Sequence, residues 1–183
     1  MANRQRTRIK HEHFLLGLLY QQPSHGYDLH KTIRQSPGLS AVWFVKPGRI
    51  YALLERLEKA GMLTATQVHS DKAPSRKVYH LTGEGERTFL DWVRQPVKHG
   101  RNMRLIFPAR LYFALRLGKE TALDLIETQR RECQLWLEDI HAKTDLDSQS
   151  EFFYKQISLY RTGQIEAMLN WLKTCEQEIS STL

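Results

Sequence analysis

One segment in the first half of the chain limits the possible folds more than any other. Four of its apolar residues follow the i, i+3, i+4, i+7 spacing of a single helix face: Ile50, Leu53, Leu54 and Leu57. Pro47 suits the first turn of such a helix, and Gly61 suits the left-handed residue that ends one. The opposite face carries a different set: Arg49, Ala52, Arg56 and Lys59. The pattern predicts a helix that is buried on one side and largely basic on the other.

Shorter signals surround this helix on both sides. Helices are predicted at about 10–21 and 25–35, the second with Ser24 as its N-cap and with Ser36-Pro37-Gly38 as a break after it. Residues 62–68 and 76–81 are typical of two strands joined by a polar turn at 69–75. Thr82 is expected to cap a further helix, whose buried side is formed by Phe89, Trp92 and Val93.

The order helix–helix–helix–strand–strand–helix is typical of a winged helix-turn-helix, which we assign to residues 1–96. Residues 1–100 hold 16 Lys and Arg against 8 Asp and Glu, whereas residues 101–183 hold 11 against 12. The whole positive excess therefore lies in the first half, as expected for a surface that meets a polyanion. A solvated basic surface that serves only solubility remains an open alternative.

The second half is predicted to be entirely helical. We interpret 97–105 as a basic, polar hinge and 106–183 as a dimerisation domain with helices at about 106–117, 119–143 and 151–180. The second helix has a heptad-like stripe of Leu123, Ile126, Arg130, Cys133, Leu137 and Ile140. The third has a stripe of Phe153, Ile157, Tyr160, Gln164, Ala167 and Trp171. These stripes can pair within the chain, but three helices make a thin core, so we expect a second subunit to cover part of them. The fold class is therefore α+β, mostly α.

Composition excludes several other classes of protein. The chain has 183 residues, 41% hydrophobic and 26% charged, as in a soluble globular protein. No stretch approaches the roughly 20 apolar residues of a membrane span, and the N-terminal residues lack a secretory cleavage pattern. Cys133 and Cys175 are far apart and form no CxxC motif, which fits the reducing cytoplasm.

Catalytic and metal-binding interpretations find little support. His11 and His13 would point to different faces of a helix, and no HExxH or Cys/His cluster accompanies them. Gly83 and Gly85 fit a helix start better than a phosphate loop, and Ser24, His25 and Asp28 are too close in one helix to align as a triad. We expect neither an enzyme nor a bound cofactor or metal.

Three ordered motifs resemble the PadR family of transcriptional regulators. HFLLGLLYQQPSHGYDLHKTI (13–33) is similar to the "LGLL…GYDL" opening of that family. KPGRIYALLERLEKAGML (46–63) resembles its recognition helix "GxIYxLLxRLExxGxL", and SRKVYHLTGEGERTFLDWV (75–93) resembles its "YxLTxxGxxxLxxW" segment. Ala52 departs from the pattern, because many members carry proline at that position, which alters only the first turn of the helix.

The second half also resembles one branch of this family, through IFPARLYFALRLG (106–118) and the Trp-containing MLNWLKTC (168–175). The resemblance implies a homodimeric repressor that binds double-stranded DNA and is often released by a small molecule. A winged-helix module for protein interaction or RNA binding, without operator specificity, remains the alternative function.

The residues expected to contact DNA lie in three segments. The start of the helix that begins near Pro47 would present Lys46, Arg49 and Tyr51 to base edges. The second and third segments, the wing and the N-terminal tail, would hold phosphates or enter the minor groove through Lys72, Arg76, Lys77, Arg4, Arg6 and Arg8. Tyr51 could equally be half core, and Arg56 is expected to be a surface ion-pair partner.

Four aromatic residues flank the predicted junction between the two halves: Trp43, Trp92, Phe107 and Tyr112. Aromatic side chains at a domain junction are a usual lining for a small-molecule site, so we assign these four to a possible effector pocket. Ordinary core packing explains them equally well.

Overall fold

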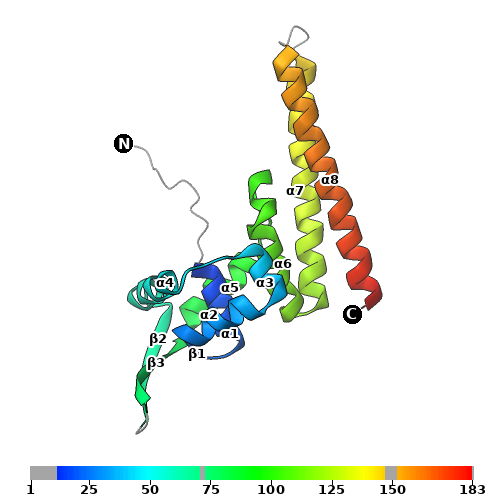
Figure 1. The fold of residues 1–183 in the computed structure, drawn as a ribbon. Coiled ribbons are helices and arrows are strands. Elements are labelled where there is room, and N and C mark those ends of the chain that lie inside the picture. The colour runs from blue at the N-terminus through cyan, green and yellow to red at the C-terminus, as the bar shows by residue number, and fades with distance from the viewer. Residues whose placement is uncertain (1–11, 71–72, 147–151, 183) are drawn as a thin grey trace. The chain divides into compact units, whose positions relative to one another are not determined.

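The computed structural model describes residues 12–70, 73–146 and 152–182 (Figure 1). It divides the chain into two compact units, 1–93 and 94–183. The first unit holds five helices and a three-stranded sheet within its described residues, and the described residues of the second form helices and no strand. The prediction of a winged helix followed by a helical C-terminal part is confirmed.

The helices of the first unit lie close to their predicted positions. They are α1 (Glu12–Gln21), α2 (Gly26–Gln35), α3 (Pro37–Val42), α4 (Pro47–Lys59) and α5 (Gly83–Arg94). The short helix α3 was not predicted, because Ser36-Pro37-Gly38 looked only like a break. In the structure Ser36 Oγ accepts a hydrogen bond from the Leu39 backbone N–H at 3.4 Å, so the same residues that end α2 also start α3.

The sheet corrects two further predictions. Its strands β1 (Ser24–His25), β2 (Leu63–Ser70) and β3 (Ala73–Leu81) are antiparallel in the order β1-β3-β2. Ser24 is not the N-cap of α2, because its backbone pairs with Tyr79 of β3. His25 occupies the cap position, and its side chain makes no capping hydrogen bond to α2. The predicted turn at 69–75 is too long, because β2 and β3 remain paired out to Ser70 and Ala73.

The predicted stripe of α4 forms the centre of the first unit's core. Ile50, Leu53, Leu54 and Leu57 are each at most 3% exposed, and α4 packs against α1, α2 and β2. Phe14 of α1 extends this core, with its ring 4.7 Å from that of Trp43 and 5.8 Å from that of Trp92 between centroids. Burial of side chains of this size contributes about 1.5–3 kcal/mol each, so this packing fixes the orientation of α4.

The end of α4 is tied to the start of α5 through one threonine. Gly61 has a φ of +73°, the left-handed conformation that favours glycine after a helix. Thr82 Oγ1 donates a hydrogen bond to the Gly61 carbonyl at 2.8 Å and accepts one from the Gly85 backbone N–H at 3.1 Å. The prediction that Thr82 caps α5 is confirmed. Gly85 is required by close packing, because a Cβ there would lie 2.2 Å from the Met62 carbonyl oxygen.

The second unit contains one 3₁₀ helix and three α-helices. These are η1 (Gly100–Arg104), α6 (Ile106–Leu117), α7 (Lys119–Leu146) and α8 (Phe152–Thr182), which confirms the three predicted helices. Val97, placed in the predicted hinge, is buried, and the Gln129 side chain of α7 bonds both its backbone N–H (2.7 Å) and its carbonyl (3.2 Å). Within the described ranges, no helix has both the length and the apolar character needed to cross a membrane.

The long helix α8 has apolar residues on two opposite sides. It lies beside α7 (Figure 1). Its buried residues recur every seven positions: Ser158, Ile165, Leu172 and Ile179. The stripe predicted from the sequence lies on the other side of the helix, where Phe153, Tyr160 and Trp171 are 69%, 63% and 40% exposed. On α7, by contrast, Ile126 and Cys133 of the predicted stripe are fully buried. The α8 stripe therefore does not form the seam with α7.

Replacing Gly85 with alanine tests the close approach of α5 to the end of α4. The new methyl group would collide with backbone rather than a movable side chain, so Gly85→Ala should lower the free energy of unfolding by about 1–3 kcal/mol. Gly83→Ala is the matched control, because a Cβ at Gly83 meets nothing within 4 Å. Urea unfolding followed by tryptophan fluorescence measures both, and equal effects would contradict the packing described.

Candidate nucleic-acid interface

The first turn of α4 presents two cations away from the core. Lys46 is the N-cap residue of α4, and the Arg49 backbone N–H donates to the Lys46 carbonyl at 3.0 Å. Both side chains are exposed and lie off the buried stripe. Neither forms an ion pair or a side-chain hydrogen bond within the described part of the chain. Two long cationic side chains are therefore available at one end of a rigidly held helix.

Tyr51 lies between core and surface. Its side chain is 49% exposed, and one edge of its ring covers Gly26 at the start of α2. A Cβ at Gly26 would lie only 2.6 Å from Tyr51 Cε1, so the glycine allows α2 and α4 to approach closely. The sequence offered two interpretations of Tyr51, a DNA contact or a half-core residue. In the structure one side of the ring packs against Gly26, and the other side is exposed.

A shallow cavity of about 550 Å³ adjoins Tyr51 and reveals residues that the sequence analysis missed. Its lining includes Tyr27, Lys31 and Arg34 of α2, together with Pro47 of α4. These three α2 side chains are exposed and follow the i, i+4, i+7 spacing of a helix face. These side chains lie on the face of α2 opposite the buried Leu29 and Ile33. Their spacing could have identified them from the sequence as an exposed basic face. The exposed basic surface thus extends from α4 onto α2.

The wing adds two more basic residues, which differ in their surroundings. Arg76 of β3 is exposed and has no ion-pair partner among the described residues. Lys77 Nζ lies 3.3 Å from Glu58 Oε2 of α4, with the two side chains 49% and 32% exposed. The Lys77 carbonyl is also 2.9 Å from His25 Nδ1 of β1. Lys77 therefore connects the wing to α4, and its charge is partly compensated by Glu58.

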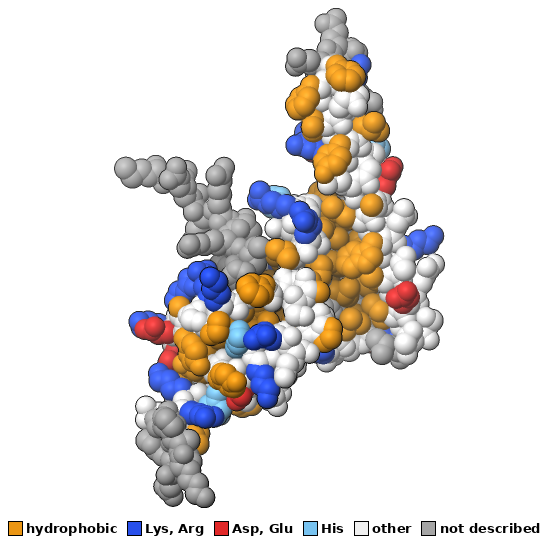
Figure 2. Space-filling view, viewed as in Figure 1, with side chains coloured by type: hydrophobic (Ala, Val, Ile, Leu, Met, Phe, Trp, Pro, Cys, Tyr) orange, Lys and Arg blue, Asp and Glu red, His pale blue; other side chains and the backbone are white. Residues whose placement is uncertain are grey.

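Four of the predicted contact residues, Arg4, Arg6, Arg8 and Lys72, lie outside the described residues. Figure 2 shows Lys and Arg side chains interspersed with apolar and His side chains over the visible face of the first unit. The prediction that Arg56 is a surface ion-pair partner is confirmed, since Arg56 Nε lies 3.4 Å from Glu12 Oε1 of α1. Lys59 donates to Glu55 Oε1 at 2.7 Å and thereby lowers the pKa of the Glu55 carboxyl.

The four aromatic residues of the predicted effector pocket are packed within their own units. Trp43 and Trp92 are buried in the first unit, where the His13 ring stacks on Trp92 at a centroid distance of 5.1 Å. In the second unit Phe107 packs edge-on against Trp171 at 5.7 Å, and the Arg116 guanidinium lies 3.4 Å from the centre of the Tyr112 ring. A pocket that joins all four stays a prediction.

Metal-ligating side chains, thiols and exposed cations differ in their surroundings within the described residues. Within them, no group of three or more His, Cys, Asp or Glu side chains could hold a metal ion. Cys133 is buried within its own unit, and burial raises the pKa of its thiol. The exposed cations on α4, α2 and β3 are suited to a polyanionic partner.

Comparison with known proteins gives a family match over most of the first unit. The model of the transcriptional regulator PadR-like family matches residues 15–91. Among solved structures, a PadR-like transcription factor from Bacteroides fragilis is 31% identical, over 44% of this chain and 73% of that one, with a TM-score of 0.39. Bacillus subtilis PadR in complex with operator DNA is 22% identical, over 94% and 99%, with a TM-score of 0.48. The PadR-like regulator BC1756 from Bacillus cereus is 24% identical, over 97% and 99%, with a TM-score of 0.44. No curated protein matches the chain.

The Glu58–Lys77 pair yields a prediction about polyanion binding. Glu58→Gln removes one negative charge and releases Lys77, so the affinity for duplex DNA of random sequence should rise several-fold at low salt. The slope of log affinity against log salt should steepen by less than one unit, because Lys77, already partly available, would then meet a phosphate with its full charge. The free energy of unfolding should fall by no more than about 1 kcal/mol, because the pair is half-exposed.

Glu55→Gln is the matched control for this prediction. It removes the same charge from the same helix, but its hydrogen-bonded partner is Lys59, and its interaction with Lys77 is a weaker one without an ion-pair contact. Titration of labelled DNA at several salt concentrations compares the two variants. An equal gain from both would show that the helix charge matters and the release of Lys77 does not.

Proposed function

This chain belongs to the PadR-like family of transcriptional regulators, and on that premise we propose that it is a sequence-specific repressor. In this proposal the chain binds an inverted-repeat operator in double-stranded DNA as a homodimer and is released by a small molecule. The observation that carries the proposal is the exposed start of α4, where Lys46 and Arg49 lie off the buried stripe.

Helix α4 is the element proposed to enter the major groove. Its N-terminal residues would contact base edges, as the recognition helices of helix-turn-helix proteins do. The Arg49 guanidinium can donate two parallel hydrogen bonds to a guanine, which is the commonest specific contact between a side chain and a base. Tyr51, half-exposed beside Gly26, would contribute to the same surface.

The remaining cations are proposed to hold the DNA backbone. Arg76 is exposed on the wing, and Lys31 and Arg34 are exposed on the neighbouring helix α2. Phosphate contacts fix the register of a protein on the duplex but carry no sequence information themselves. Lys77 and the predicted contacts Lys72, Arg4, Arg6 and Arg8 belong to the same group in this proposal.

The homodimer is proposed to form through the exposed side of α8. Phe153 and Tyr160 lie on that side, away from the residues packed on α7. Trp171 lies beside them, and its partly exposed ring also packs against Phe107. Large apolar side chains that recur along one exposed helix face are typical of a surface that a second helix covers. A two-fold dimer would place two α4 helices in successive half-sites of an inverted repeat.

Ligand release requires that the effector prefer one conformation of the dimer. A ligand that binds both conformations equally shifts nothing, however tightly it binds. The effector must therefore favour the geometry in which the two α4 helices cannot occupy both half-sites.

Two substitutions should affect DNA binding in different ways. Arg49→Ala should cost about 1–3 kcal/mol on the operator and relax the base preference at one position, with little loss on random DNA. Lys77→Ala should weaken operator and random DNA alike and reduce the salt slope by about one unit. Gel shifts on both DNAs, with RNA of the same length as competitor, measure these effects. Equal losses on operator and random DNA for Arg49→Ala would overturn the base-reading role, and equal competition by RNA would favour the alternative function.

The dimer surface gives a separate prediction. Tyr160→Asp should shift the chain from dimer to monomer in sedimentation, with unchanged helix content by circular dichroism, because it places a charge in the proposed interface. Lys173→Gln is the matched control, since it makes the same change in net charge on the opposite side of α8. Truncation after Ser150 should likewise give monomer or aggregate. A truncated chain that remains a dimer would contradict the assignment of α8.

A further inference from the structure

A half-open cavity of about 760 Å³ lies within the second unit, between η1, α7 and α8. It includes none of the four aromatic residues predicted as an effector site. We propose that this cavity binds a planar aromatic molecule that carries phosphate groups, the chemical class to which nucleotides belong. The inference rests on the ligand response within the proposed function and assigns that response a site and a ligand class.

The charge of the lining is unbalanced. Arg101 and Arg104 of η1 and Arg161 of α8 all line the cavity. None of the three is in an ion pair or a side-chain hydrogen bond with another described residue. The one carboxylate in the lining, Asp139, already accepts a hydrogen bond from Lys143, which lies outside the cavity. Three guanidinium groups therefore face the cavity region with no anion to compensate them.

The number of free guanidinium groups points to phosphate and away from a single carboxylate. One arginine satisfies a carboxylate through two parallel hydrogen bonds. Three arginines offer many more donors, which match the several charged oxygens of one or more phosphate groups. His99 and Lys98 also line the cavity, and the Lys98 ammonium, which already donates to Glu132, has further donors.

The rest of the lining is apolar and includes one aromatic ring. Trp136 of α7 contributes its indole, and Ile140, Ile165 and Met168 complete the apolar side. Trp136 Nε1 donates to Glu132 Oε1 at 3.1 Å, which fixes the orientation of the ring. A fixed indole favours stacking of a flat aromatic group. The cavity volume lies within the usual range of about 300–1,000 Å³ for small-molecule sites.

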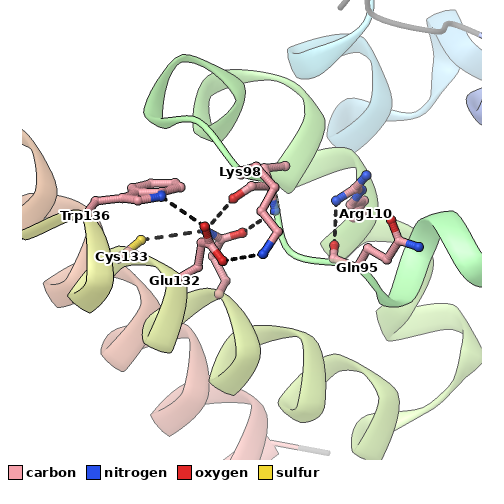
Figure 3. A network of polar contacts seen from close by, with 8 residues as sticks. Gln95, Lys98, Arg110, Glu132, Cys133 and Trp136 are labelled. Carbon is pink, nitrogen blue, oxygen red and sulfur yellow. Dashed lines mark hydrogen bonds and ion pairs between the residues drawn. The ribbon is translucent and has the colours of Figure 1, made fainter. Parts of the chain in front are cut away.

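The same residues connect the cavity to the segment that follows α5 (Figure 3). Glu132, which holds Trp136 through one oxygen, accepts a hydrogen bond from Lys98 Nζ through the other at 2.6 Å. The neighbouring Val97 is held at both backbone groups by the buried Gln129. The buried Arg110 bonds the Gln95 carbonyl in the same stretch. A ligand that contacts Trp136 and Lys98 would thus act on residues 95–98, which are continuous with α5.

Calorimetry on the full-length chain without DNA tests the site, with ADP as the probe. ADP should bind, whereas adenosine, which lacks the phosphates, and pyrophosphate, which lacks the ring, should bind at least about tenfold more weakly. Arg161→Gln should weaken ADP binding by about tenfold or more, because it removes one charged donor. Lys173→Gln, which removes one charge from α8 outside the cavity, should leave ADP affinity unchanged. Trp136→Phe should abolish the fluorescence quenching that ADP produces.

Several results would overturn the proposal. These are no binding of ADP, equal losses for Arg161→Gln and Lys173→Gln, or quenching that survives Trp136→Phe. Tight binding of benzoate without binding of ADP would mean a carboxylate ligand. Loss of duplex DNA binding by Arg161→Gln, in a chain that does not bind ADP, would assign the arginines to the DNA backbone. Because these titrations contain no DNA, a chain that binds ADP but no operator would refute the proposed function and leave the site intact.

Discussion

The burial of one face of α4 determines what its other face can do. Ile50, Leu53, Leu54 and Leu57 are sealed against α1, α2 and β2, so the helix cannot rotate without exposing several large side chains. Two close contacts at glycines restrict the position of α4 further. The Tyr51 ring lies against Gly26, and the Met62 carbonyl lies against Gly85. Lys46 and Arg49 are therefore carried on a rigid element, which is what specific recognition of base edges requires.

The second unit relies on the same physical principle on a longer helix. One side of α8 is packed on α7 through residues seven positions apart, and another side exposes Phe153 and Tyr160, with Trp171 beside them. A helix with two apolar sides can hold its own unit together and still bind a second copy. The start of this unit is held on α7 by two sets of contacts. The Gln129 side chain bonds the backbone of Val97, and Lys98 forms an ion pair with Glu132. In our account, ligand binding in the second unit and DNA binding in the first are linked along this segment.

The sequence predicted those features that depend on local periodicity and capping. The stripe of α4, the left-handed Gly61, the Thr82 cap and the helices of the second half all follow from short-range patterns. It missed α3 because a Pro-Gly pair looks the same whether it ends a helix or begins the next. It also misassigned Ser24, whose role is set by pairing with Tyr79 far along the chain. Contacts of that kind, including Lys77 with Glu58, arise only when distant segments meet, so the sequence could propose Lys77 as a contact but not show that it is partly neutralised.

The most direct test of this account is the selection of genomic DNA fragments bound by the full-length chain, followed by sequencing. Two rigidly held α4 helices in a two-fold dimer predict that the bound fragments share an inverted repeat. The centres of its half-sites should lie one helical turn apart, about 10 base pairs, or a multiple of that. Fragments with no common motif, or with single half-sites bound as tightly as pairs, would contradict the account.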